Sequence, residues 1–213
     1  MTYLQVVNNV LRRMRENEVS AVSENTYSAM VGDYVNDAYK LIKDSWKWSS
    51  LRQNISIATV DATPSYELTG TDYALEILSV IDTDTGEFLT YKPQVWFTEK
   101  YNQPIVSGRP TYYTYDGEAS GVPKVKLYPQ PNDVYNLSFN TVVRADELTD
   151  GADVVLVPTL PLIHMSIALL SRERGETGGP SAAELYSIAD RYLGDAIALD
   201  ANKHPEELVW NYI

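Results

Sequence analysis

Apolar residues at the start of the chain recur at helical spacing. The first stripe, with positions three and four residues apart, consists of Leu4, Val7, Leu11 and Met14. A polar break follows, after which Ser23 or Asn25 can cap a second helix that ends around Trp46. The stripe of that helix consists of Tyr27, Met30, Tyr34, Val35, Ala38, Leu41 and Ile42. The first 50 residues are therefore predicted to form two helices.

The pattern changes after Leu51 from helical spacing to alternation. Alternating segments, each typical of a strand, lie at 54–60, 77–81, 87–91, 111–115, 124–128 and 135–140. A short helix is expected between Pro93 and Asn102, and turns are expected at 82–86, at Asp116-Gly117 and at 129–133. No helix between these strands is long enough for repeated βαβ crossovers. The sequence therefore predicts an antiparallel sandwich or small barrel.

Helical spacing returns near Pro161. One helix is expected from there, and a second from Pro180 to about His204, with a glycine-rich break at 175–179 between them. The last eight residues form a separate apolar and aromatic tail that contains Leu208, Val209, Trp210, Tyr212 and Ile213. Large apolar side chains at a terminus favour docking, either on the chain's own body or on another subunit.

The predicted fold class is α+β. Residues 1–50 and 158–205 would form a four-helix body, and residues 51–157 a β-rich insertion. Residues 206–213 would form a C-terminal docking tail. The start of the chain lacks the basic and apolar pattern of an export signal, and no apolar run is long enough to cross a bilayer. We therefore expect no membrane association.

The amino-acid composition excludes several kinds of chemistry. The 213 residues include no cysteine and only two histidines, His164 and His204, which excludes disulfides, thiolate nucleophiles and cysteine-ligated metals. There are 17 basic and 29 acidic residues, a net charge of −12, which disfavours a general nucleic-acid binder. Residues 61–150 carry 6 basic and 14 acidic groups, so the sequence assigns most of the acidity to the β-region. Sixteen tyrosines against three phenylalanines favour surfaces buried by a partner.

Candidate sites in the sequence have simpler structural explanations. Asp82-x-Asp84-x-Gly86 suggests a calcium loop, but it lacks the later ligands of an EF-hand and is better read as a hairpin turn. The glycines at 175–179 lack the ending of a phosphate loop and favour an interhelical turn. His164 is expected to be a partly buried helix residue. No cofactor, metal site or catalytic residue is predicted.

A small basic cluster closes the first predicted helix. Arg12, Arg13 and Arg15 suit the C-terminal end of a helix, where cations interact favourably with the helix dipole. A solvated helix end explains them most simply, and contact with an acidic partner is the alternative. The cluster is a weak candidate for a nucleic-acid binding site, because few aromatic residues are interleaved with it.

Several segments together resemble the head-to-tail adaptor proteins of tailed bacteriophages, including those called tail tubular protein A. The segments are TYLQVVNNVLRR at 2–13, residues 31–48 with VNDA at 35–38 and WKW at 46–48, GRPTYY at 108–113, LYPQPN at 127–132, and DELTD at 146–150 with the run to Leu162. Each is a structural signature, and none carries catalytic chemistry.

The resemblance implies a non-enzymatic virion protein at the head–tail junction, assembled in the host cytoplasm. Such adaptors form a homo-oligomeric ring, usually of twelve copies, between the portal and a tail or nozzle protein. Genomic DNA would pass through an acidic channel, and the docking tail would reach the portal. The expected interaction residues are Leu208, Val209, Trp210, Tyr212, Ile213, Arg12, Arg13 and Arg15. The alternatives are another tail-completion protein or a small hydrolase that acts through His164.

Overall fold

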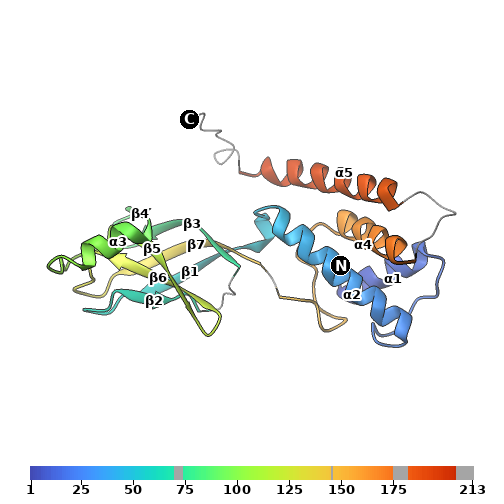
Figure 1. Ribbon diagram of the computed structural model, residues 1–213, viewed down its shortest axis with the longest axis horizontal. Helices are drawn as coiled ribbons and strands as arrows, with labels where there is room; N and C mark the ends of the chain where they lie inside the picture. The colour runs from blue at the N-terminus through green and yellow to red at the C-terminus, as the bar shows by residue number, and fades with distance from the viewer. Residues whose placement is uncertain (70–73, 145, 175–181, 205–213) are drawn as a thin grey trace. The chain divides into compact units, whose positions relative to one another are not determined.

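The computed structural model describes residues 1–213 except 70–73, 145, 175–181 and 205–213 (Figure 1). The chain forms two compact units. A helical unit combines Met1–Ser50 with Ala145–Ile213, and a β-unit comprises Leu51–Arg144. The predicted α+β class is confirmed. Each unit has its own core, so each is described by itself.

The helical unit is built around α4. Its helices are α1 (Tyr3–Arg13), α2 (Thr26–Ser45), α4 (Thr159–Arg174) and α5 (Ala182–Ala201). Helix α4 contacts the other three, as Figure 1 also shows, and its side chains from Leu162 to Leu170 are mostly buried. A helix that is apolar on nearly all sides is one that other helices surround. The described residues contain a fifth helix, α3 (Gln94–Tyr101), in the β-unit, where a short helix was predicted between Pro93 and Asn102. The helices are therefore not confined to the predicted four-helix body.

Side-chain caps fix where the first two helices begin. Thr2 and Gln5 form a reciprocal capping box at the start of α1. Asn25, one of the two predicted candidates, caps α2 and accepts a hydrogen bond from the Ser28 N–H. Helix α2 ends at Ser45, and the buried Trp48 indole then donates to the Ile42 carbonyl.

Residues 146–157, which follow the β-unit in sequence, bind the start of α1 through backbone hydrogen bonds. We call this segment the strap. The N–H groups of Tyr3 and Leu4 donate to the carbonyls of Asp153 and Gly151, and the Val155 N–H donates to the Met1 carbonyl, at 2.9 to 3.0 Å. The sequence assigned this segment to the β-insertion, which was expected to end at 157. In the structure the β-unit ends at Arg144, because the strap makes its backbone bonds with the start of α1.

The β-unit is one seven-stranded sheet with the order β1-β7-β3-β4-β5-β6-β2. The strands are β1 (Arg52–Ala58), β2 (Ser65–Glu67), β3 (Leu75–Asp82), β4 (Phe88–Tyr91), β5 (Tyr112–Ala119), β6 (Val122–Tyr128) and β7 (Asn136–Val143). The first half of β4 pairs antiparallel with β3, and its second half pairs parallel with β5. The sheet therefore curls about β4, and side chains from both halves share one core that includes Val80, Leu127 and Phe139.

Three details of the predicted β-region need correction. The curled sheet is a half-barrel, but it is not wholly antiparallel: β4 and β5 are parallel, because the chain passes through α3 (Gln94–Tyr101) between them. Strand β2 was not predicted. The expected turn at Asp116-Gly117 is wrong: β5 continues through it with an irregularity at which Gly117 has a positive φ of 76°. The chain turns instead at Ser120-Gly121, where both φ angles are positive.

The observed unit boundaries also change how the net charge is divided between the two parts of the chain. The helical unit carries 10 basic and 18 acidic residues, net −8, and the β-unit carries 7 and 11, net −4. The expectation that the β-region holds most of the acidity is therefore wrong, because Asp146, Glu147 and Asp150 of the strap belong to the helical unit. Within the described part of the chain, no helix is long and apolar enough to span a membrane.

Candidate interaction site

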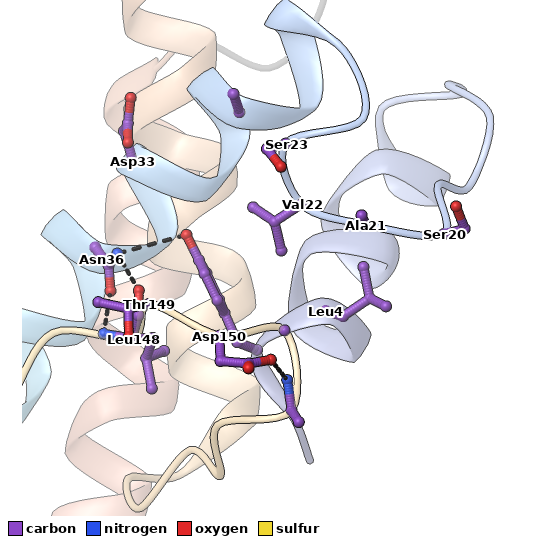
Figure 2. A pocket seen from close by; sticks show the side chains of 14 residues that line it. Leu4, Ser20, Ala21, Val22, Ser23, Asp33, Asn36, Leu148, Thr149 and Asp150 are labelled. Atoms are coloured by element: carbon purple, nitrogen blue, oxygen red, sulfur yellow. Dashed lines mark hydrogen bonds between the residues drawn. The ribbon is translucent and has the colours of Figure 1, made fainter.

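An open pocket of about 830 Å³ lies where α1, α2 and the strap meet (Figure 2). Tyr3 and Leu4 enter it from the start of α1, Asp33 and Asn36 from α2, and residues 148–152 from the strap. We call this the strap pocket. Residues 20–23 of the connection between α1 and α2, together with Ala29, complete the lining. The contributions of the start of α1, of Asp33 and Asn36, and of the strap each lie within a segment that resembles the phage adaptors.

Asn36 holds the strap by its backbone. Its Nδ2 donates to the Leu148 carbonyl at 2.9 Å, and its Oδ1 accepts from the Leu148 N–H at 3.0 Å. The same Nδ2 lies 3.4 Å from the Tyr3 hydroxyl, as the dashed lines in Figure 2 show. One amide therefore satisfies both backbone groups of a residue that is itself buried.

Two glycines allow close packing around this contact. A Cβ at Gly32 would lie 2.5 Å from the Tyr3 hydroxyl oxygen and 2.6 Å from the Val22 Cγ1. A Cβ at Gly151 would lie 3.3 Å from the Leu4 Cβ. Glycine at these positions lets the Tyr3 ring lie directly on α2 and lets the strap lie on α1.

The strap is also fixed by its own side chains. The Asp153 carboxylate accepts from the N–H groups of Asp150 and Thr149, at 2.8 and 2.7 Å. These backbone bonds hold the pKa of Asp153 below its usual value. The Asp150 carboxylate accepts from the Ala152 N–H at 2.9 Å, which Figure 2 also shows. Residues 149–153 of the strap thus form a preorganised turn.

The charged side chains that line the strap pocket, Asp33 and Asp150, are both acidic. Burial raises the pKa of Tyr3 to about 12, and the negative charges of Asp33 and Glu147 add to this effect. Tyr3 therefore stays a neutral hydrogen-bonding group at any physiological pH.

The predicted arginine cluster lies at the opposite end of α1 from Tyr3. Arg12 and Arg13 occupy its last turn, and Arg15 has a positive φ of 62° just beyond it. The Arg12 guanidinium pairs with Glu18 at 3.2 Å, and Arg13 donates to His164 Nε2 at 3.0 Å. The structure does not bring these residues to the strap pocket. Leu208, Val209, Trp210, Tyr212 and Ile213 lie outside the described residues.

The two histidines have structural contacts. His164 accepts from Arg13 and lies against the Tyr192 ring, with centroids 4.7 Å apart. Burial, and then the charge of Arg13, lower the pKa of His164. His204 contacts the Ser49 hydroxyl at 3.0 Å, while the nearby Asp200 carboxylate accepts from the Ser49 N–H at 2.9 Å and pairs with Lys203. The predicted partly buried helix histidine is confirmed for His164.

The other candidate sites can also be located. Asp82 and Asp84 lie at the predicted hairpin turn, where Asp82 Oδ1 accepts from the Asp84 N–H and Arg109 pairs with both carboxylates. Among the described residues, no group of three or more acidic or histidine side chains could hold a metal ion. The glycine-rich break at 175–179 lies outside the described residues.

The two resembling segments of the β-unit also meet each other. The Gly108 N–H donates to the Gln130 carbonyl, and the Thr111 N–H donates to the Tyr128 carbonyl, both at 2.9 Å. Sequence reasoning singled out these segments and those of the strap pocket only as signatures. It missed Asn36 and Tyr3 as contact residues, since neither their spacing nor their charge marks a site.

The family described as SU10 adaptor protein matches residues 1–206, which is nearly the whole chain. A comparison with curated proteins found no match. The matched range includes every part of the strap pocket and both resembling segments of the β-unit. The chain therefore belongs to the SU10 adaptor protein family and has the role of a structural phage adaptor.

Proposed function

We propose that this chain is the repeating subunit of a ring that joins the portal to the tail at the head–tail junction of the virion. The observation that carries the proposal is the family match over residues 1–206. A second observation supports the proposal. Three of the segments that resemble phage adaptors meet at the strap pocket, where their hydrogen bonds hold α1, α2 and the strap together. Ring assembly, a central channel and contact with the portal are the finer parts of this proposal.

The helical unit suits repeated contacts with neighbours. Its strap is fixed at both backbone groups of Leu148 and by the Asp153 carboxylate, so little conformational entropy would be lost when a partner binds. The arginine end of α1 would contact a neighbouring subunit or the portal. The docking tail would supply apolar anchors, with Trp210 and Tyr212 as its largest side chains.

The charge distribution suits a channel that passes DNA. Both units are net negative, at −8 and −4, so a lumen lined by either unit would repel the phosphate backbone. DNA could then slide through without being bound. The proposed role requires no catalysis, and the histidine contacts described above are compatible with a purely structural protein.

The test is the mass of the wild-type protein alone and with purified portal. The proposal predicts that portal captures several chains as a discrete ring. Deleting residues 206–213 should weaken attachment to portal while the circular dichroism of the chain stays unchanged. A wild-type chain that remains monomeric on portal would refute the ring, and unchanged attachment of the truncated chain would refute the role of the docking tail.

A further inference from the structure

One face of the β-unit carries a cluster of aromatic rings with lysines above them. Helix α3 packs on β5 and β6 through Trp96, Phe97, Tyr101, Tyr112 and Tyr128, whose neighbouring ring centroids lie 5.0 to 6.4 Å apart. Three ammonium groups lie over these rings: Lys126 over Tyr101 at 4.4 Å, Lys92 over Tyr112 at 5.4 Å, and Lys100 over Trp96 at 5.6 Å. We call this surface the lysine face.

The three lysines have no acidic partner among the residues that the structure describes. No described carboxylate pairs with Lys92, Lys100 or Lys126, whereas Arg109 of the same unit pairs with Asp82 and Asp84. The rings hold the ammonium groups in place, which reduces the side-chain entropy that a partner would have to remove. A partner that carries carboxylates would therefore find a preorganised cationic surface.

An exposed apolar side chain adjoins the lysine face. Val95 lies on α3 next to Trp96 and is 81% exposed. Surfaces that combine exposed apolar groups with ordered charges are typical of protein contacts. Double-stranded DNA fits less well, because it would meet only a few cations on a unit whose net charge is −4.

A surface of complementary chemistry lies on the helical unit. Asp146 and Glu147 at the start of the strap are exposed, and no cation in the described residues pairs with either of them. Two exposed apolar side chains follow in the same segment: Val154 is 62% exposed and Leu156 is 41% exposed. The strap thus presents unpaired carboxylates beside apolar groups, which is the complement of the lysine face.

We propose that the lysine face of one copy of this chain binds the strap of the next copy. The inference rests on the proposed ring and names its contact surfaces. Because the two surfaces differ, the contact is head-to-tail, and repetition of a head-to-tail contact closes a ring when the rotation permits. The contact also places opposite charges together between chains that each carry −12 and would otherwise repel one another.

Reciprocal charge reversal tests the pairing. One variant carries Lys92→Glu and Lys100→Glu, and the other carries Asp146→Lys and Glu147→Lys. A matched control, Lys40→Glu with Arg172→Glu, changes the net charge as much as the first variant does but at exposed positions of the helical unit. Assembly on purified portal is measured by mass photometry across a range of protein concentrations. Each reversal should raise the concentration needed for assembly about tenfold or more.

An equimolar mixture of the two variants is the decisive sample. In the mixture each reversed surface meets its reversed complement, so assembly should return to within about threefold of the wild type. Neutral variants, Lys92→Gln with Lys100→Gln and Asp146→Asn with Glu147→Gln, replace any reversal that fails to fold, and each should weaken assembly about threefold.

The outcomes separate this inference from the proposed function. A wild-type chain that fails to assemble on portal refutes the ring and this contact together. Wild-type assembly with unaffected variants, or variants that the mixture does not rescue, refutes only the contact. Loss of binding to a DNA duplex by the lysine variant, with assembly unchanged, would assign the lysine face to DNA and overturn the inference.

Discussion

Asn36 is predicted to be the residue that locks the strap onto the helical unit. Its amide makes one hydrogen bond to each backbone group of Leu148, which is 5% exposed. The Asn36→Ala variant removes both bonds and leaves a buried N–H and C=O, each of which costs about 1–3 kcal/mol if it stays unsatisfied. Water can enter from the open pocket, so we expect about 2 kcal/mol, at the lower end of the combined cost.

Hydrogen exchange at the Leu148 amide measures this loss locally. A change of about 2 kcal/mol corresponds to exchange about 30-fold faster. The Val19 amide is an internal reference, because Asn8 holds the backbone of Val19 by the same two-bond arrangement elsewhere in the unit. The control variant is Asn17→Ala, at an exposed position. Unchanged exchange at Leu148, or equal acceleration at Val19, would refute the reasoning.

Three further predictions concern packing and charge. Gly32→Ala should cost about 1–3 kcal/mol by urea unfolding, since its Cβ would collide with Tyr3, whereas Gly194→Ala, whose Cβ meets open space, should be neutral or stabilising. The pKa of Tyr3 is about 12 in the folded protein against an ordinary value of 10, so the contribution of the neutral Tyr3 to stability is complete below pH 10 and is lost as the pH rises through 12. The Tyr3→Phe variant should therefore lose less stability at alkaline pH than the wild type. Identical pH profiles of unfolding free energy for the two proteins would contradict this prediction. Arg109→Ala should destabilise the β-unit by about 2–3 kcal/mol, because it leaves the buried Asp82 without its cation at 2.9 Å; a loss below about 0.5 kcal/mol in chemical denaturation would contradict the pairing.

Local patterns accounted for most of the secondary structure. The spacing of Leu4, Val7 and Leu11 predicted α1, and a polar residue before an apolar stripe predicted the cap at Asn25. The Asp-Thr-Gly turn after β3 was also predicted, because it depends on residues that are adjacent in sequence. These features are set by interactions within a few positions.

Long-range pairing was less predictable. The parallel contact of β4 and β5 depends on where α3 packs, and β2 is only three residues long, too short to show alternation. The strap has no periodic pattern, and its partners at the start of α1 lie about 150 positions away. It was therefore assigned to the β-region, and its acidic residues were assigned with it.

In the candidate site, too, local features were predictable from the sequence and long-range contacts were not. Acidic residues and arginines were visible in the sequence as charges, but the bonds from Asn36 to Leu148 and the packing of Tyr3 on Gly32 were not. An asparagine within a helix is usually an exposed polar residue. Only the fold shows that this one binds the backbone of a residue 112 positions later in the chain.

Assembly into a ring is the property on which the proposed role of this adaptor depends. Native mass spectrometry of purified portal incubated with an excess of wild-type protein measures it, since each added chain contributes 23.9 kDa. We expect a single discrete complex that contains a fixed number of adaptor chains, twelve if the ring follows the phage adaptors that the sequence resembles. Free portal, or a distribution of complexes with one, two or three loosely bound chains and no closed assembly, would contradict it.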